Sequence, residues 1–478
     1  MFKRSLVIAL FSMALTCVAA QAQDVCANAT NSDKLVCFLP QSFTKGLTLA
    51  AGPHQGHFGL DSFLTTGLRP FNSAVGTQSS LLPLSSPSSG LIFTWDAAAK
   101  VFTSSTESLG PILGERAETI GKYKLFVGFS YQYFKFDSLD GVDLKKNLPT
   151  VFTHVDDSLD VTKRTCSING DSFTECGFVR DVIKTVSGID LKVHQFTTFV
   201  TFGLSNRIDV SAAIPIENLR MGQTSTGTIV NNSNSGLHVF PITATCGSIS
   251  PTFVPCLTHS FSDFRSVSGI GDIILRVKGT AWKGERAAVA LGVDVRVPTG
   301  DQLNFLGTGA AGVRPFIVVS AKGRVAPHVL VGYETNGSSL LAGDTSTSTK
   351  ARLPGQLTYS GGADVWLTKW FTAAFDLVGQ QVFEAHRTII NPNFQDIGPC
   401  APAGLAPGDP GYCTSAGPPN TYSNLSQQTG SYNISNVAFG AKLRPIAGLV
   451  ITANVLTKLN DGGLRSKFVP LVGLSYAF

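Results

Sequence analysis

Residues 287–297 read Ala-Ala-Val-Ala-Leu-Gly-Val-Asp-Val-Arg-Val, and their alternation decides the fold. Every second position from Ala287 to Val297 is apolar, whereas Asp294 and Arg296 occupy positions between them. Successive side chains of a β-strand point to opposite faces, so this segment is predicted to form a strand with one apolar and one polar face. Its length matches the roughly nine to eleven residues of a tilted strand that crosses a membrane.

The same alternation recurs in about twelve runs between Lys122 and the C-terminal Phe478. The predicted strands occupy residues 122–136, 191–204, 208–216, 272–278, 287–297, 313–321, 324–335, 355–367, 370–384, 433–444, 447–458 and 467–478. We expect tight turns at 203–206, 321–324, 367–370 and 444–448, and long polar loops at 137–188, 217–267 and 384–431. Short periplasmic turns and long outer loops are typical of a transmembrane β-barrel.

These features predict an all-β protein, an antiparallel up-and-down transmembrane barrel of about 12 strands. A possible hairpin of residues 91–96 and 100–105 would raise the number to about 14 if it joined the wall. An even number of strands places both ends of the barrel on the periplasmic side. A large secreted sandwich would also alternate, but it gives no reason for long loops at one edge and short turns at the other.

The composition supports a barrel. Charged residues make up 14% of the chain, below the usual quarter. Outside the N-terminus no run of about eighteen apolar residues occurs, which excludes transmembrane helices, and only helices and closed barrels satisfy the backbone in hydrocarbon. Removal of Lys3 and Arg4 with a signal peptide lowers the formal net charge from +5 to +3. This charge is too small and scattered to predict a nucleic-acid partner.

The chain is predicted to have three parts. Residues 1–22 resemble a signal peptide, with a basic start, an apolar centre and an Ala-Gln-Ala cleavage motif, so the mature chain would begin at Gln23 in the outer membrane of a Gram-negative-type bacterium. Residues 23–120 lack a sustained period. We interpret them as a plug-like segment, with a periplasmic extension or an extra strand pair as alternatives. Residues 121–478 form the barrel.

Eight of the nine cysteines remain after signal cleavage, and they fall into four close pairs. None has the Cys-x-x-Cys spacing of a metal or redox site, so we predict local disulfides and no metal or cofactor. Three of the pairs lie in the expected outer loops. The pairs are Cys26 with Cys37, Cys166 with Cys176, Cys246 with Cys256, and Cys400 with Cys413.

Four segments resemble the meta-pathway phenol-degradation family of outer-membrane β-barrels. They are Gly-Ile-Gly-Asp-Ile-Ile-Leu-Arg at 269–276, Val-Pro-Thr-Gly-Asp at 297–301, Leu-Gly-Thr-Gly at 306–309, and Pro-His-Val-Leu-Val-Gly-Tyr-Glu-Thr-Asn-Gly at 327–337. The resemblance covers about 269–380 and implies a channel associated with uptake of aromatic or other hydrophobic compounds. More distantly, the architecture is similar to the fatty-acid transporter barrels, which carry an N-terminal plug. Read from the residues alone, the glycines and the 298–301 turn have a structural role.

A charge on the lipid face costs about 2–4 kcal/mol at the midplane, so polar positions within strands are predicted to face the lumen. The candidate pore-lining residues are Asp272, Arg276, Lys278, Asp294, Arg296, His328, Glu334, Asp364, Asp376, Gln380, Lys442 and Arg444. These side chains either pair with one another or set selectivity at a constriction.

The predicted function is a monomeric outer-membrane channel, not an enzyme, for passive uptake of small hydrophobic or aromatic solutes. Its expected partners are outer-membrane lipid and those solutes. One alternative is a structural or adhesive surface barrel that binds through its disulfide-stapled outer loops. Another is an outer-membrane lipid hydrolase, which would need a Ser/His pair at the outer rim. The chain lacks a Gly-x-Ser-x-Gly elbow.

Overall fold

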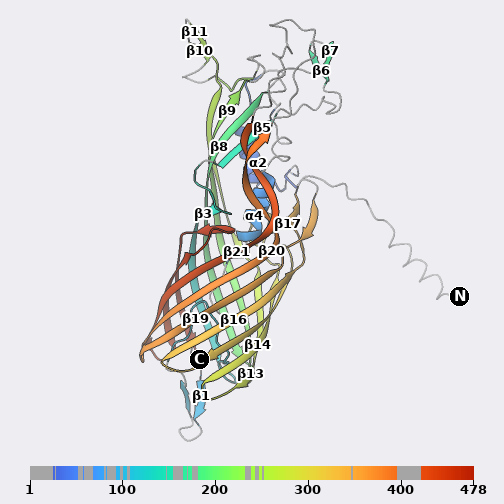
Figure 1. Ribbon diagram of the computed structural model, residues 1–478. Helices are drawn as coiled ribbons and strands as arrows, with labels where there is room; N and C mark the ends of the chain where they lie inside the picture. The colour runs from blue at the N-terminus through green and yellow to red at the C-terminus, as the bar shows by residue number, and fades with distance from the viewer. Residues whose placement is uncertain are drawn as a thin grey trace, which may run out of the picture.

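The computed structural model describes most of the barrel and parts of the N-terminal region (Figure 1). The described residues are 25–26, 28, 30–51, 58, 68–79, 82, 93–96, 101–104, 108–146, 148–153, 165–168, 171–174, 181–231, 238–242, 247–249, 252–345, 348–395 and 421–478. The signal peptide predicted at 1–22 lies outside them. Their helical elements are η1 (Leu35–Cys37), α2 (Phe38–Gly46), α4 (Leu68–Ser79) and η3 (Gln302–Asn304). No described helix is long and apolar enough to cross a membrane.

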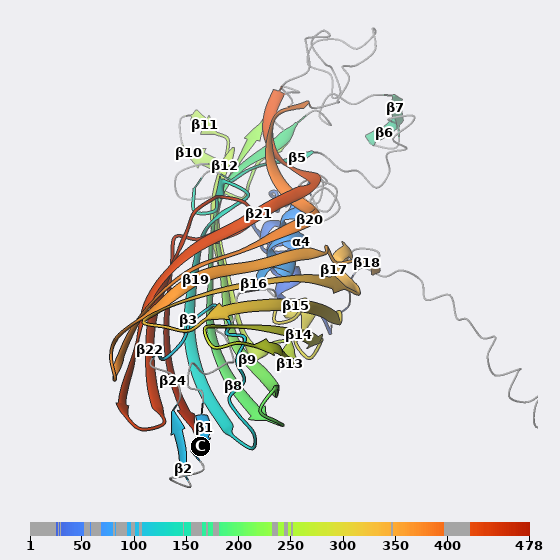
Figure 2. The same ribbon diagram turned by 60° about the horizontal axis from the view of Figure 1, so that its bottom comes forward.

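Twelve antiparallel strands close into one barrel, as predicted (Figures 1 and 2). In order around the wall they are β3 (Leu125–Leu139), β8 (Val182–Gly203), β9 (Ile208–Val230), β13 (Ile273–Lys283), β14 (Ala287–Val297), β15 (Gly312–Ala321), β16 (Val325–Asn336), β19 (Gln356–Thr368), β20 (Phe371–Gln395), β21 (Thr421–Ile446), β22 (Leu449–Lys458) and β24 (Phe468–Ala477). The last strand pairs with the first, and Leu474 of β24 lies opposite Phe129 of β3.

Shorter strands decorate this wall. They are β1 (Phe93–Asp96), β2 (Val101–Ser104), β4 (Val142–Asp143), β5 (Leu148–Thr153), β6 (Thr165–Ile168), β7 (Asp171–Thr174), β10 (Gly247–Ile249), β11 (Thr252–Val254), β12 (Thr258–Ile270), β17 (Ser338–Asp344), β18 (Thr349–Arg352) and β23 (Leu464–Ser466). Strands β1 and β2 form the expected hairpin as a sheet of their own, at the end of the barrel that holds the C-terminus (Figure 2). They add no strand to the wall, so the alternative of 14 strands is wrong.

The outer surface of the wall is apolar, as strand parity predicts. On β14, Leu291, Val293 and Val295 are 38–55% exposed, whereas Asp294 and Arg296 are at most 5% exposed. Exposed apolar side chains continue around the wall and end in aromatic residues at the short-turn end, among them Trp282, Trp370, Tyr476 and Phe478. An apolar band with an aromatic border is the surface that an outer-membrane barrel presents to lipid.

The predicted long loops are wrong in part, because four barrel strands continue far beyond the expected ends. Strand β8 begins at Val182, β9 ends at Val230, β20 ends at Gln395 and β21 begins at Thr421. Most of strand β12, up to residue 267, also lies inside the supposed loop 217–267, and the strand pairs with the far half of β9. These extended halves rise from the wall at the end opposite the short turns (Figure 1).

The extended half of β9 escaped prediction because its polarity is reversed. On β9, Ile208 to Ile216 are apolar on the outer face, but beyond Ile216 the outer positions Asn218 and Arg220 are polar. The inner positions Leu219 and Met221 are there apolar and fully buried. The change of face marks the level at which the strand leaves lipid and enters water, where an ordinary protein core must lie inside.

That core is completed by the N-terminal region, and we call the assembly the outer cap: η1, α2, β5, β12 and the extended halves of β8 and β9. Phe43 of α2 packs on Phe152 of β5 and on Phe261 of β12, with ring centroids 5.3 and 5.7 Å apart. Arg265 of β12 donates hydrogen bonds to the carbonyl oxygens of residues 32 and 34 and to the Gln41 side chain. The outer cap therefore covers the outer end of the barrel with folded structure.

The cysteines are described only in part. Cys26 and Cys37 form a disulfide at the start of the outer cap. Cys256 is disulfide-bonded, and its expected partner Cys246 lies outside the described residues. The side chain of Cys166, and all of Cys176, Cys400 and Cys413, also lie outside them.

Two other pieces of the region 23–120 lie within the barrel. Helix α4 packs on β17, β20 and β21 at the outer end, and its Phe71 and Val75 are fully buried. Residues 108–120, which we call the inner segment, run through the barrel at the short-turn end: the Ile120 amide donates to Asp209 at the start of β9, and the Ala117 amide donates to Ser320 near the end of β15.

A charge placed on the lipid face tests this assignment. We expect Val293→Arg, in the middle of β14, to reduce the free energy of unfolding by about 2–4 kcal/mol. Val325→Arg, at the short-turn edge of the same band, should cost only about 0–1 kcal/mol. Urea unfolding of both variants from lipid vesicles measures the difference. Equal losses would mean that the band is not in contact with hydrocarbon.

Candidate functional site

The barrel encloses a cavity of about 210 Å³, which we call the lumen cavity. It is lined by β8, β9, β13–β16 and β19–β21, and by Leu82, Leu113 and Glu115 of the N-terminal region. An engineered cavity of about 150 Å³ in another protein binds benzene. The lumen cavity is therefore large enough for a small aromatic molecule.

The two sides of the lumen cavity differ in chemistry. The side formed by β9 and β13–β16 carries charges: Glu217, Asp272, Arg276, Asp294, Arg296, Arg314 and Glu334. The remaining lining includes neutral polar groups such as Gln356, Ser360 and Gln380, and apolar side chains such as Leu82, Leu113, Val378 and Ile434. A site of this kind can hold an apolar body and orient a polar group.

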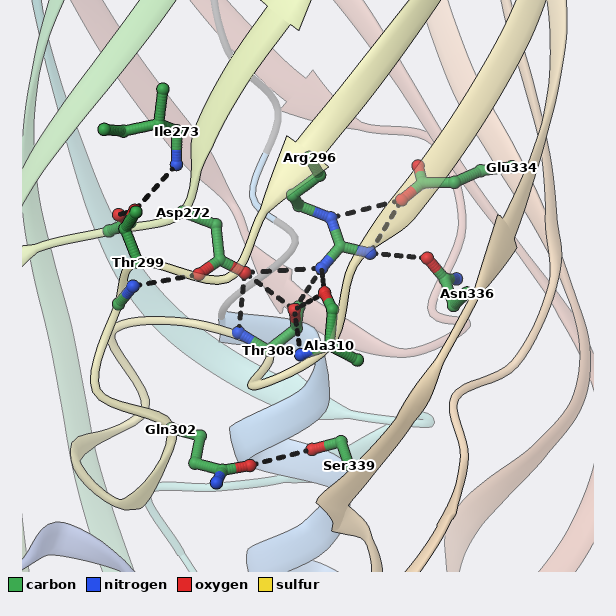
Figure 3. Close-up of polar contacts among 12 residues, drawn as sticks. Asp272, Ile273, Arg296, Thr299, Gln302, Thr308, Ala310, Glu334, Asn336 and Ser339 are labelled. Atoms are coloured by element: carbon green, nitrogen blue, oxygen red, sulfur yellow. Dashed lines mark hydrogen bonds and ion pairs between the residues drawn. The ribbon is translucent and has the colours of Figure 1, made fainter. Parts of the chain in front are cut away.

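Arg296 organises the outer part of the charged side (Figure 3). Its guanidinium donates to Glu334 at 2.8 Å, to Asp272 at 3.3 Å and to the Ala310 carbonyl at 3.1 Å, and it also contacts Thr308 and Asn336. Asp272 in turn accepts from the Gly300 amide at 3.0 Å and from the Thr308 amide at 2.8 Å. These bonds fold the β14–β15 loop into the barrel.

The four segments that carried the family resemblance meet at this point. Asp272, Gly300, Thr308 and Glu334 come from one segment each, and all lie around Arg296 (Figure 3). A Cβ atom at Gly307 would lie 2.4 Å from Asp272 Oδ1 and 2.7 Å from the Gly300 Cα. The glycines therefore let two backbone turns approach the same carboxylate, which is the structural role that the residues predicted.

A second hub joins the wall to the inner segment. Glu115 accepts from Arg276 at 2.6 Å and from Lys278 at 2.7 Å. Arg276 also bonds Asp294 at 2.6 Å, and Lys278 donates to the carbonyl oxygens of residues 116 and 118. All four side chains are at most 8% exposed. Buried charges are tolerated only when they are paired and hydrogen-bonded in this way.

On the opposite side of the inner segment, His328 lies beside two carboxylates. Its Nε2 atom is 2.6 Å from Asp376, and its Nδ1 atom is 3.7 Å from Asp364. Arg116 binds Asp364 at 2.7 Å. A Cβ atom at Gly114 would lie 2.2 Å from the His328 ring, so only glycine lets the inner segment pass this histidine. The inner segment is thus fitted closely to the wall.

The predicted pore-lining residues divide into three groups. Asp272, Arg276, Asp294, Arg296, Glu334 and Gln380 line the lumen cavity. Lys278, His328, Asp364, Asp376 and Lys442 are buried against the inner segment, where Lys442 donates to the carbonyl oxygens of residues 109 and 111. Arg444 is not in the cavity lining: it lies near the end of β21, beside the β21–β22 turn, and donates to the Lys369 carbonyl. Parity alone cannot tell a turn position from a lumen position.

Sequence reasoning missed Glu217, Glu115 and Arg314. Glu217 follows directly on the predicted strand 208–216 and shares the parity of its inner face, but it was assigned to a loop. Arg314 lies on an inner-facing position of β15, and the same parity rule would have found it. Glu115 lies in a segment without periodicity, and its sequence gives no signal of its partners.

Comparison with known proteins supports the family resemblance. Residues 185–381 match the family described as "Putative MetA-pathway of phenol degradation". This match includes all four segments quoted above and confirms the resemblance. No curated protein matches the chain.

Solved outer-membrane barrels resemble the chain only distantly. An outer membrane channel from Pseudomonas putida F1 has 11% identity and a TM-score of 0.40, over 76% of this chain and 98% of that chain. A FadL homologue from Pseudomonas aeruginosa has 10% identity and a TM-score of 0.27, over 74% of this chain and 89% of that chain. The NanC porin has 8% identity and a TM-score of 0.30, over 61% of this chain and 98% of that chain. At these identities and TM-scores, none of these structures indicates a ligand or solute for this chain.

The Glu115 hub gives a stability prediction. We expect Glu115→Gln to lower the free energy of unfolding by about 3–5 kcal/mol, because it takes the carboxylate partner from buried Lys278 and one of two carboxylate partners from Arg276. The double variant Glu115→Gln/Lys278→Met should recover part of the loss. Urea unfolding from lipid vesicles measures both.

The control is Lys34→Met, which breaks the partly exposed Lys34–Asp301 ion pair of 2.7 Å. It should cost no more than about 1 kcal/mol. A Glu115→Gln barrel as stable as this control would show that the inner segment is not anchored by the hub.

Proposed function

We propose that the protein is a monomeric outer-membrane channel for passive uptake of small hydrophobic or aromatic solutes. The observation that carries the proposal is the lumen cavity, enclosed by a closed wall and lined by both apolar and polar side chains. The family match to residues 185–381 supports the same reading.

The region 23–120 acts, in this proposal, as a plug. The outer cap covers one end of the barrel, and the inner segment is bonded to the wall at the other. A solute therefore passes through narrow spaces between folded parts and not through an open pore. Narrow passages lined by specific polar and apolar side chains favour selectivity over a high flux.

The predicted pore-lining residues that bound the lumen cavity then shape the passage without a strong ion preference. Arg276 and Arg314 both bind Asp294, and Arg296 binds Asp272 and Glu334. Charges neutralised in this way leave little net field to sort cations from anions. The passage then selects a solute by the size of the molecule and by the hydrogen bonds that the molecule can form.

Catalysis has less support than transport. His328 is engaged by Asp376, His238 by Asp181 and His194 by Tyr131. A nucleophilic hydrolase needs a histidine within hydrogen-bond reach of a serine hydroxyl, and these three rings have other partners. A surface barrel that binds through its outer loops is the remaining alternative, and the experiment below separates it from a channel.

Two neighbouring residues of β16 test the proposal. Leu330 lines the lumen cavity, whereas Val331 is 39% exposed on the lipid face. Leu330→Ala should widen the passage and raise uptake of an aromatic glycoside into liposomes, together with the conductance in planar bilayers. Val331→Ala removes a similar apolar volume from the other face and should leave both rates unchanged.

The controls are the same liposomes without protein and a test of folding by heat-dependent gel mobility. If folded protein gives no uptake and no conductance, in the wild type or in Leu330→Ala, the channel is refuted and the adhesive alternative gains support.

A further inference from the structure

One acidic side chain of the lumen cavity lacks the ion pair that the other described acids of the lining form. Glu217 of β9 lines the cavity and is only 5% exposed. Its Oε1 atom accepts a hydrogen bond of 2.9 Å from the Gln195 amide on β8. Its Oε2 atom has no hydrogen-bond partner among the described residues, and neither has the Gln195 carbonyl oxygen.

The other charged side chains that line the cavity form ion pairs. Asp294 binds Arg276 and Arg314, and both Asp272 and Glu334 bind Arg296. Glu115 binds Arg276 and Lys278. Among the described residues that line the cavity, Glu217 is the acid for which the structure gives no ion pair.

An unpaired buried carboxylate is costly, and a hydrophobic residue would serve the barrel better if only packing mattered. The position nevertheless keeps the Oε2 acceptor, which no described residue saturates.

We propose that Glu217, with Gln195 beside it, accepts a hydrogen bond from the hydroxyl group of the solute in the lumen cavity. The inference rests on the channel proposed above and narrows its substrates to apolar molecules that carry a neutral donor. Apolar side chains such as Ile274, Leu330 and Ile434 surround the body of the solute.

An anionic solute finds no free counter-charge among the described residues that line this cavity. The lining holds three arginines, and every one of them already binds a carboxylate. A carboxylate solute would therefore have to enter without an ion-pair partner, which is costly in a buried site.

Equilibrium binding to the full-length protein in detergent micelles tests this inference by fluorine NMR. The probes are 4-fluorophenol, 4-fluoroanisole, which lacks the donor, and 4-fluorobenzoate, which is an anion at pH 7. The same micelles without protein correct for partition of each probe into detergent. We expect the phenol to bind about tenfold or more tightly than the anisole, as a hydrogen bond to a charged group implies, and the benzoate to bind least.

The variants separate Glu217 from the rest of the cavity. Glu217→Leu should abolish the preference for phenol over anisole, and Glu217→Gln, which keeps one acceptor but no charge, should reduce it. Gln132→Leu removes a buried polar group of β3 that does not line the cavity and should leave the preference intact. A thermal unfolding curve of each variant in the same micelles shows whether the barrel is still folded, so that loss of fold is not mistaken for loss of the preference.

Equal binding of phenol and anisole to the wild type would overturn the inference, and so would a preference that survives in Glu217→Leu. Tightest binding of the benzoate would overturn it as well. These outcomes are independent of the uptake assay: a barrel that conducts without discriminating refutes the role of Glu217 alone, and a barrel that discriminates without conducting refutes only the channel.

Discussion

The structure depends on a wall of hydrogen-bonded strands that closes on itself. In hydrocarbon an unpaired amide or carbonyl costs several kcal/mol, so the first and last strands must meet, as β3 and β24 do. Closure fixes which side of each strand faces lipid and which faces the lumen. On β14 this places Val293 outside and Asp294 inside. Once the wall is closed, the polar side chains of twelve strands are confined in one narrow space.

That confinement explains the chemistry of the lumen. Charges that cannot reach water must find counter-charges or backbone groups. Arg296 donates to a carbonyl of the β14–β15 loop, whose Thr308 amide binds the neighbouring Asp272. Lys278 donates to a carbonyl of the inner segment. The segment that fills the barrel is therefore bound by the same groups that the wall would otherwise leave unpaired. Glu217 departs from this rule, and a departure at a buried position points to a function more strongly than the pairs do.

The barrel also shows how a strand crosses from one solvent into another. Below Ile216, β9 turns its apolar side chains outward to lipid; above it, Leu219 and Met221 turn inward. Side chains alternate with a period of two in both halves, but the apolar residues lie on the outer face in the lower half and on the inner face in the upper half. The outer cap is thus an ordinary water-soluble core built on the continuation of membrane strands.

The sequence by itself determined the number of wall strands, their order and their lipid face, because a period of two is a local property that each run displays alone. The sequence-based predictions that failed also have physical causes. Strands β8 and β9 were cut short because their outer halves exchange faces, and β20 was cut short where a β-bulge interrupts its alternation between Val382 and Ala385. Asp272, Gly300, Thr308 and Glu334 carried a family resemblance whose reason, a shared position around Arg296, is invisible until the chain folds. Only the tertiary structure decided that Glu115 pairs with Lys278 and that Glu217 pairs with no cation. Such contacts join residues remote in sequence, and no local pattern encodes them.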